Sequence, residues 1–596
     1  MRLRVVVSVV LSMWAEVVAG EAPLVTTHEG RVAGVIEAST KGRVFYSYYG
    51  LPYAKPPLGP LRLKDPAPVE PWEGVRDGSR LPEMCLQVPF GDTVAGVRLP
   101  PEGLSGSEDC LYLNVFTPRQ EPAGLRDQPA GLRDQPAGLP VMVYIHGGGF
   151  FSGGTNEYLP HALLNHDIVL VVLQYRLGTL GFLSTEDSVI PGNFGLKDQT
   201  LALQWVQRNI HHFGGDKTKV TIFGQSAGGA SVHYHMLSPK SDGLFARAIM
   251  QSGTSLSPWA LARTHRTQAQ YVAAALGCPT QRASQAILQC LQDSDGRSLA
   301  ALAHDFFKWS ILPMTVTPRV DGDFLQEEPG LLVREGRFRK VELMAGSVRE
   351  EGAMFTHAML TNKELVSALK SNFSEIAPVT LQCEGESADP VALARSIFTY
   401  YLGDQELEPV ARSDQLTKMF SDRLVSVDVE QVVKHQAKFT STYRYVLTHR
   451  GHLSFSDVFP TDVGSHWVSH CDDLLYLFRA DSILKLPHDL QDHVDLHLRD
   501  TITSLWTNFA ATGNPTPDDS LGFTWRPSTE DNLQYLALTP NPTMEADLRH
   551  EVRRFHASLP TTMNQALHPQ LVGNHDQLPA GVVEASSDGD NGRDEL

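Results

Sequence analysis

A serine stands at the junction of a predicted strand and a predicted helix, with a glycine two places to either side. The pentapeptide Gly224-Gln225-Ser226-Ala227-Gly228 follows the strand-like run 220–223 and precedes the helix-like run 229–237. A serine at such a junction is exposed only if the chain turns sharply, and flanking glycines allow that turn without a Cβ clash. A plain glycine turn is the alternative, but the flanking strand and helix favour a nucleophile elbow. We therefore predict that Ser226 is a nucleophile.

The chain around this elbow alternates between strands and helices. Predicted strands cover 111–116, 140–145, 168–175 and 219–223, and predicted helices cover 198–210 and 229–237. The run 168–175 is nearly continuously apolar, as expected for a strand buried on both faces. Alternation of this kind predicts the α/β class, with a central, mostly parallel sheet flanked by helices.

Three glycines follow the predicted strand 140–145, in the motif His146-Gly147-Gly148-Gly149. Acyl transfer develops negative charge on a carbonyl oxygen, and backbone N–H groups stabilise that charge when no side chain blocks their approach. A flexible glycine loop is the alternative. Together with the elbow downstream, the motif predicts an oxyanion hole made by the N–H groups of Gly148, Gly149 and Ala227.

Charge and hydropathy exclude several classes of protein. The 596 residues carry a formal net charge of −18, without the basic stretch that binding to nucleic acid requires. Residues 1–20 have an n-region with two arginines and a short apolar stretch, which predicts a signal peptide. No later stretch reaches the roughly 18 apolar residues of a membrane span.

Two further segments fall outside the predicted α/β pattern. The segment 121–139 repeats the heptapeptide Pro-Ala-Gly-Leu-Arg-Asp-Gln, and its proline and glycine content predicts a surface loop. A docking role for this loop is the alternative. The residues 568–596 are predicted to form a flexible tail. We expect one enzymatic domain over 21–567.

Motifs along most of the chain, from about 26 to 555, resemble those of the type-B carboxylesterase and cholinesterase family, which has the α/β-hydrolase fold. They stand at 50–54 (GLPYA), 71–74 (PWEG), 107–114 (SEDCLYLN), 175–178 (YRLG), 193–199 (NFGLKDQ) and 320–322 (VDG). The resemblance implies the disulfides Cys85–Cys110 and Cys278–Cys290 and the ion pairs Arg62–Glu108 and Arg176–Asp198. It leaves Cys383 and Cys471 unassigned. The sequon at Asn372 predicts glycosylation.

The resemblance also implies the acid and the base. The family's acid maps to Glu351, with the neighbouring Glu350 as the alternative, and its histidine maps to His470. The family usually has glycine three places before this histidine, where this chain has Trp467, so a shifted alignment to His466 stays open.

With these residues the expected mechanism is ester hydrolysis through an acyl-serine, without a metal or an organic cofactor. By resemblance, Gln225, Ser252 and Asp473 form a hydrogen-bonding network behind the triad, although capping and core bonds would explain them as well. A metal site at His233 and His235 is the weaker hypothesis, because no acidic or cysteine spacing completes it.

The expected substrate is a small, apolar ester. Cholinesterases hold their ammonium group with a tryptophan before the Ser-Glu-Asp-Cys motif, but residues 91–109 contain no aromatic side chain. Phe151, Trp259, Met314 and Phe355 fall where the family lines its gorge, although each would also suit a core. Gln225 resembles the elbow of juvenile-hormone esterases and related arthropod carboxylesterases, whereas 62–63 read Arg-Leu and not their Arg-Phe. The alternatives are a lipase and a catalytically silent, neuroligin-like adhesion protein.

The residues Arg593-Asp594-Glu595-Leu596 resemble the Lys-Asp-Glu-Leu retrieval signal. With the signal peptide, they predict a protein of the endoplasmic-reticulum lumen that is bound by a retrieval receptor. Secretion is the alternative.

Overall fold

A computed structural model describes residues 22–94, 96–119, 138–280, 283–403 and 407–572. The predicted signal peptide, nearly all of the repeat-bearing loop, most of the predicted tail and the last four residues lie outside these ranges.

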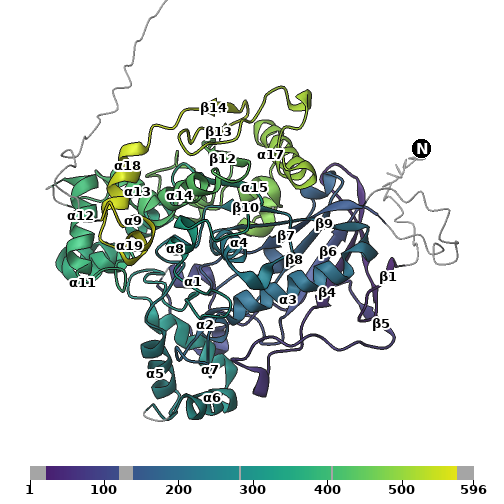
Figure 1. Cartoon of the computed structure of the whole chain (residues 1–596), viewed down its shortest axis with the longest axis horizontal. Coiled ribbons are helices and arrows are strands. Elements are labelled where there is room, and N and C mark those ends of the chain that lie inside the picture. The colour runs from purple at the N-terminus through teal and green to yellow at the C-terminus, as the bar shows by residue number, and fades with distance from the viewer. Residues whose placement is uncertain (1–21, 95, 120–137, 281–282, 404–406, 573–596) are drawn as a thin grey trace, which may run out of the picture.

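Eleven of the described strands form one sheet, in the order β14-β13-β12-β11-β10-β9-β7-β8-β6-β4-β3 (Figure 1). Neighbouring strands from β13 to β8 run parallel, and the pairs at both ends of the sheet are antiparallel. A smaller sheet, β1-β2-β5, lies at the N-terminal side. The strands are β1 (Leu24–Thr26), β2 (Arg31–Ala33), β3 (Val35–Ala38), β4 (Val44–Pro52), β5 (Val75–Asp77), β6 (Tyr112–Thr117), β7 (Leu139–Ile145), β8 (Val169–Leu173), β9 (Gly215–Gln225), β10 (Arg247–Gln251), β11 (Glu342–Val348), β12 (Thr442–Leu447), β13 (Tyr535–Leu538) and β14 (Thr543–Glu545).

Alternate side chains of the central strands enter two different hydrophobic clusters, one on each face of the sheet. On β7, Val143 and Ile145 belong to one cluster, while Met142 and Tyr144 belong to the other. All five residues of β8 are buried. Because both faces are covered, the strands need apolar residues at every position, which explains the continuous run in the sequence.

Helices also contribute side chains to both hydrophobic clusters. Trp205 on α3 packs into the first cluster and Trp506 on α17 into the second. Figure 1 shows α9, α11, α12, α13, α18 and α19 gathered at one end of the sheet, and α5 to α7 forming a projection below it. The helices are α1 (Phe90–Val94), α2 (Gly178–Phe182), α3 (Phe194–Asn209), α4 (Ala227–Leu237), α5 (His265–Ala275), α6 (Ser284–Asp293), α7 (Gly296–Ala301), α8 (Pro329–Arg334), α9 (Ala353–Thr361), α10 (Lys363–Ser371), α11 (Phe373–Thr380), α12 (Pro390–Leu402), α13 (Ser413–Ser421), α14 (Val427–Gln436), α15 (Leu474–Leu477), α16 (Ala480–Leu484), α17 (His493–Thr512), α18 (His550–Ser558) and α19 (Thr562–Leu567).

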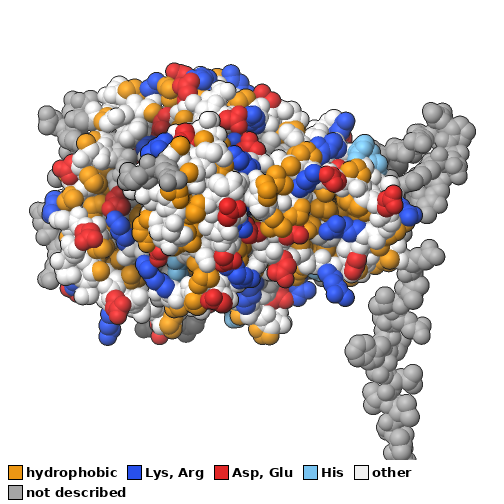
Figure 2. Space-filling view, turned by 90° about the horizontal axis from the view of Figure 1, so that it is seen from below, with side chains coloured by type: hydrophobic (Ala, Val, Ile, Leu, Met, Phe, Trp, Pro, Cys, Tyr) orange, Lys and Arg blue, Asp and Glu red, His pale blue; other side chains and the backbone are white. Residues whose placement is uncertain are grey.

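Charged side chains of both signs are interspersed on the face seen in Figure 2, with apolar side chains between them. In the described ranges, no helix combines the length and the apolar character that crossing a membrane requires.

Candidate active site

Ser226 lies in the sharp turn between β9 and α4, with φ 58° and ψ −123°. A positive φ is strained for a residue with a Cβ, and such strain is typical of functional positions. The flanking glycines are required by close packing: a Cβ on Gly228 would lie 2.0 Å from the Ile145 oxygen, and one on Gly224 would lie 2.6 Å from the Gly228 backbone. The backbone N–H of Ser226 donates to the Gln251 carbonyl at 2.8 Å. The turn is therefore held on both sides by backbone contacts.

The glycine loop after β7 lies against this turn. A Cβ on Gly147 would stand 3.1 Å from the Cβ of Ser226. Gly148 and Gly149 have φ values of 100° and 59°, which glycine adopts without strain. Within the described part of the chain, neither of their N–H groups has a hydrogen-bond acceptor. The N–H of Ala227, in the first turn of α4, has no partner in the helix.

Glu351 and His470 meet in the interior beside the elbow. The Oε2 atom of Glu351 lies 2.6 Å from Nδ1 of His470, and its Oε1 atom accepts the N–H of Val348 at 2.8 Å. Glu351 follows β11 closely, and both side chains are buried. Because a carboxylate only accepts hydrogen bonds, Nδ1 carries the ring proton and the neutral ring keeps a lone pair on Nε2.

The environment of His470 favours its protonated form. Burial lowers the pKa of this histidine, but the neighbouring charges outweigh burial and raise it well above the ordinary value. Burial also raises the pKa of the adjacent Cys471 thiol, so that thiol is neutral at pH 7. Cys471 and Glu351 are the two neighbours that raise the pKa of His470, and of these only the Glu351 carboxylate is charged at pH 7.

The structure places the two alternative residues elsewhere. Glu350 accepts hydrogen bonds from the Val468 N–H at 2.7 Å and from Arg349 Nε at 2.6 Å. The side chain of His466 is 68% exposed, and its Nε2 atom lies 3.8 Å from Asp414. Neither side chain takes part in the contact between Glu351 and His470.

Trp467, which departs from the family pattern, is buried. Its indole lies over Gly464, where a Cβ would come within 2.1 Å of the ring, and its Nε1 donates to Asp414 Oδ1 at 2.9 Å. Its ring lies 4.9 Å from that of His357. The tryptophan therefore packs within the loop that contains His470, here called the histidine loop, against Gly464, Asp414 and His357.

A family model described as the carboxylesterase family matches residues 21–556. The chain belongs to the carboxylesterase family. It is 37% identical to "Juvenile hormone esterase" of Tribolium castaneum, over 84% of this chain and 85% of that protein. It is 33% identical to "Venom carboxylesterase-6" of Apis mellifera, over 91% and 96%, and 34% identical to "Pyrethroid hydrolase Ces2a" of Mus musculus, over 93% and 94%. The chain is therefore a serine carboxylesterase, and the predicted α/β-hydrolase fold is confirmed.

The residues behind the predicted triad are only partly those that the sequence predicts. In this carboxylesterase, Gln225 Nε2 lies 3.1 Å from His470 Nε2. Asp473 Oδ2 instead accepts hydrogen bonds from Gln251 Nε2 and the Tyr445 hydroxyl, both at 2.8 Å. The Ser252 hydroxyl is buried and has no partner among the described residues.

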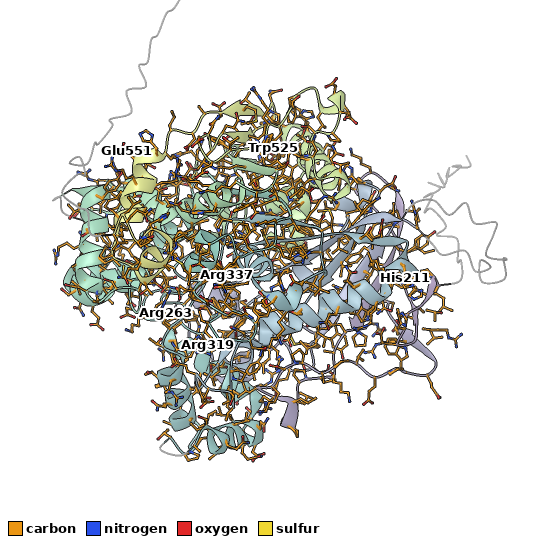
Figure 3. All side chains as sticks on the ribbon, in the orientation of Figure 1. His211, Arg263, Arg319, Arg337, Trp525 and Glu551 are labelled. Atoms are coloured by element: carbon orange, nitrogen blue, oxygen red, sulfur yellow. A yellow bond between two sulfur atoms is a disulfide. The ribbon has the colours of Figure 1, made fainter. Side chains whose placement is uncertain are left out.

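The sequence does not predict the contacts of Gln251 and Tyr445 with Asp473, because only the order of strands in the sheet brings these residues together. Gln251 pairs in register with Gln225 across β10 and β9. Trp525, labelled in Figure 3, lies beyond Tyr445, with the two rings 6.5 Å apart.

Aromatic side chains wall a cavity beside Gly149. Phe151, Phe306, Phe307 and Met314 line it, and it has about 10 Å³ of free volume, the space of one water molecule. The rings of Phe151 and Phe307 lie 5.0 Å apart. Phe306 and Phe307 were not predicted.

The other two residues expected to line the gorge, Trp259 and Phe355, are buried and do not line this small cavity, although the Trp259 ring lies 6.3 Å from that of Phe150. The Trp259 indole donates to the Leu424 carbonyl at 2.7 Å, and Phe355 lies 5.6 Å from the Phe420 ring.

The covalent and ionic contacts implied by the resemblance are present in this carboxylesterase. Disulfides join Cys85 to Cys110 and Cys278 to Cys290. Arg62 pairs with Glu108 and Arg176 with Asp198, both at 2.7 Å. Cys383 and Cys471 are free thiols.

The histidines considered for metal binding have other partners. His233 Nδ1 lies 2.8 Å from the Ser255 hydroxyl, and His235 is bonded to Ser241 and Gln199. Burial lowers the pKa of both histidines to about 3. Across the described ranges, no group of three His, Cys, Asp or Glu side chains is placed to hold a metal ion.

Proposed function

We propose that this chain hydrolyses apolar carboxylic esters with Ser226 as nucleophile, His470 as general base and Glu351 as the acid that orients the base. The contact between Glu351 Oε2 and His470 Nδ1 carries the proposal. It fixes the tautomer in which Nε2 is able to accept a proton, and Gln225, the residue before Ser226, lies 3.1 Å from that nitrogen through its own Nε2 atom.

In the proposed reaction, the Ser226 oxygen attacks the ester carbonyl while its proton moves to His470 Nε2. The imidazolium then gives this proton to the departing alkoxide, and an acyl-serine remains. Water then attacks the acyl-serine while His470 takes its proton. The imidazolium returns a proton to the Ser226 oxygen as the acid leaves. The buried carboxylate of Glu351 stabilises the imidazolium in both steps.

The proposed oxyanion hole consists of the N–H groups of Gly148, Gly149 and Ala227. Two observations support it: the first two groups have no acceptor in the described structure, and the third lies in the first turn of a helix. Donors that are already oriented lower the barrier because nothing has to reorganise as charge develops.

We propose an uncharged ester with an apolar body as the substrate class. Phe151, Phe307 and Met314 form an apolar wall beside Gly149. The 37% identity to a protein named juvenile hormone esterase makes a juvenile hormone or a related terpenoid ester the first substrate to test. A lipase would instead prefer emulsified triglyceride over the same short ester in solution.

We further propose that the protein enters the secretory pathway through residues 1–20, is glycosylated at Asn372 and is retained in the endoplasmic-reticulum lumen by Arg593–Leu596. The Asn372 side chain is exposed, which glycosylation requires, and the residue lies at the N-terminal end of α11.

Covalent labelling tests the proposed nucleophile. Diethyl 4-nitrophenyl phosphate should release one equivalent of 4-nitrophenolate per chain and leave a diethylphosphoryl group on the peptide that contains Ser226, as measured by mass spectrometry. A silent adhesion protein would release none. Label on another residue would show that the nucleophile is wrongly assigned.

A further inference from the structure

The base of the proposed triad already has a hydrogen-bond partner, and that partner is not the nucleophile. Gln225 Nε2 lies 3.1 Å from His470 Nε2, and both side chains are buried. Since Nδ1 carries the ring proton toward Glu351, Nε2 of the neutral ring is an acceptor. The amide of Gln225 therefore donates its hydrogen to the lone pair that has to receive the Ser226 proton.

We propose that Gln225 caps His470 whenever the ring is neutral and therefore able to act as general base, and that Ser226 has to displace the amide before its proton moves. This inference rests on the proposed function. In a neutral imidazole the unprotonated nitrogen has a single lone pair in the plane of the ring. Nε2 therefore accepts a well-aligned hydrogen bond from only one donor at a time. Gln225 is thus a positioning residue that acts through His470.

The position of Gln225 is fixed by its surroundings. It is the last residue of β9, between β7 and β10, and it is 1% exposed. A Cβ on Gly147 would come within 3.1 Å of the Gln225 Oε1 atom, so the oxygen end of the amide lies toward the glycine loop. The nitrogen end is left facing His470.

The ionisable groups around His470 come from different segments. Glu351 follows β11 and raises the pKa of His470, while Cys471 and Asp473 lie on the histidine loop itself. Gln225 is uncharged at every pH, so the cap adds no charge to this set. A carboxylate at position 225 would be different: it accepts from the imidazolium and has no hydrogen to give to the neutral ring.

Three variants separate a cap from a packing role. Gln225→Met keeps the length of the side chain but has no donor, and Gln225→Glu keeps the shape but adds a negative charge. Gln199→Met is the matched control, because Gln199 is also buried against a histidine, with its Oε1 atom 2.9 Å from His235 Nε2, away from the triad. Thermal unfolding of each variant shows whether it is folded.

The measurement is the second-order rate of labelling by diethyl 4-nitrophenyl phosphate as a function of pH. In this step the Ser226 Oγ–P bond forms, 4-nitrophenolate leaves and His470 Nε2 takes the proton. Gln225→Met should react about 2- to 10-fold faster than the unchanged chain at pH 8, because a neutral hydrogen bond no longer competes. Gln225→Glu should raise the pKa seen in the rate profile by about one pH unit or more. Gln199→Met should match the unchanged chain in both respects.

The proposed cap is wrong if Gln225→Met is labelled no faster than the unchanged chain. It is also wrong if Gln225→Glu leaves the pKa of the rate profile where it is in the unchanged chain. If Gln225→Met does not fold, the pKa of Gln225→Glu decides alone. Failure of the proposed function has a different signature, since the unchanged chain would then carry no label on Ser226.

Discussion

Glu351 Oε2 lies 2.6 Å from His470 Nδ1, although 119 positions separate the two residues in the chain. The contact forms because Glu351 follows β11 and His470 lies in the loop before α15, where the loop meets the end of the sheet. A parallel bridge between Glu350 and Ser469 joins the two segments one residue before each partner. The backbone thus sets the distance between the proposed acid and base.

Loss of the nucleophile is the most direct test of the proposed chemistry. Ser226→Ala should lower kcat/KM for a 4-nitrophenyl ester by roughly 10³-fold or more, because only binding and the oxyanion hole remain. Steady-state hydrolysis by a folded variant measures this. Near-normal turnover would move the nucleophile to another residue.

The two histidines of the loop should differ sharply. His470→Ala should remove labelling of Ser226, whereas His466→Ala should keep most of the activity, because the His466 side chain is 68% exposed. Parallel rate measurements on the two variants compare them. The opposite pattern would place the base four residues earlier.

The pH profile should reflect the raised pKa of His470. A general base works only when it is neutral, so activity falls as pH drops through its pKa. Because neighbouring charges raise this pKa well above the ordinary 6.5, the midpoint of the acid limb of kcat/KM should lie above pH 6.5. Glu351→Gln should move that midpoint downward and lower the rate by roughly 10³- to 10⁴-fold. A midpoint below 6.5 in the unchanged chain would contradict the assignment.

Choline esters should have no advantage over uncharged esters of the same acyl length. Residues 91–109 contain no aromatic ring to attract a quaternary ammonium group, an attraction that is worth on the order of 1–2 kcal/mol. The ratio of kcat/KM for acetylthiocholine and for an uncharged thioester should therefore stay below about tenfold. A strong preference for the choline ester would require a cation site elsewhere.

Deletion of Arg593–Leu596 should move the protein into the culture medium with unchanged specific activity. Adding one alanine after Leu596 is the matched control. It keeps the tetrapeptide, but the tetrapeptide no longer ends in a free carboxylate. Both variants should be secreted. Equal secretion of the unchanged chain would favour an extracellular esterase.

The sequence predicts the centre of the sheet well because burial on both faces leaves a strong signal. The apolar run 168–175 becomes β8, and the run before the elbow becomes β9. The observed β9 begins at Gly215, four residues before the predicted strand 219–223, because Gly215 pairs with Leu139 on β7. Pairing between distant strands leaves no periodic pattern in the sequence.

Side-chain contacts behind the base were harder to predict. The sequence predicts a role for Asp473 but not for Tyr445 and Gln251, whose polar groups reach its carboxylate from β12 and β10. Ser252 was expected in the same network, yet only its backbone N–H has a described partner, the Gly346 carbonyl. Strand order and side-chain rotamers decide such contacts, and neither is visible in one sequence.

Trp467 and Gly464 occupy each other's space, since a Cβ at 464 would come within 2.1 Å of the indole. Positions 464 and 467 should therefore covary in an alignment of close relatives, with a tryptophan at the second position only where the first is glycine. A relative with glycine at the second position is free to place a larger residue at the first. Of the two stepwise routes to this pair, only the one that places glycine at 464 before tryptophan at 467 avoids the clash, so the order of the two replacements should be fixed.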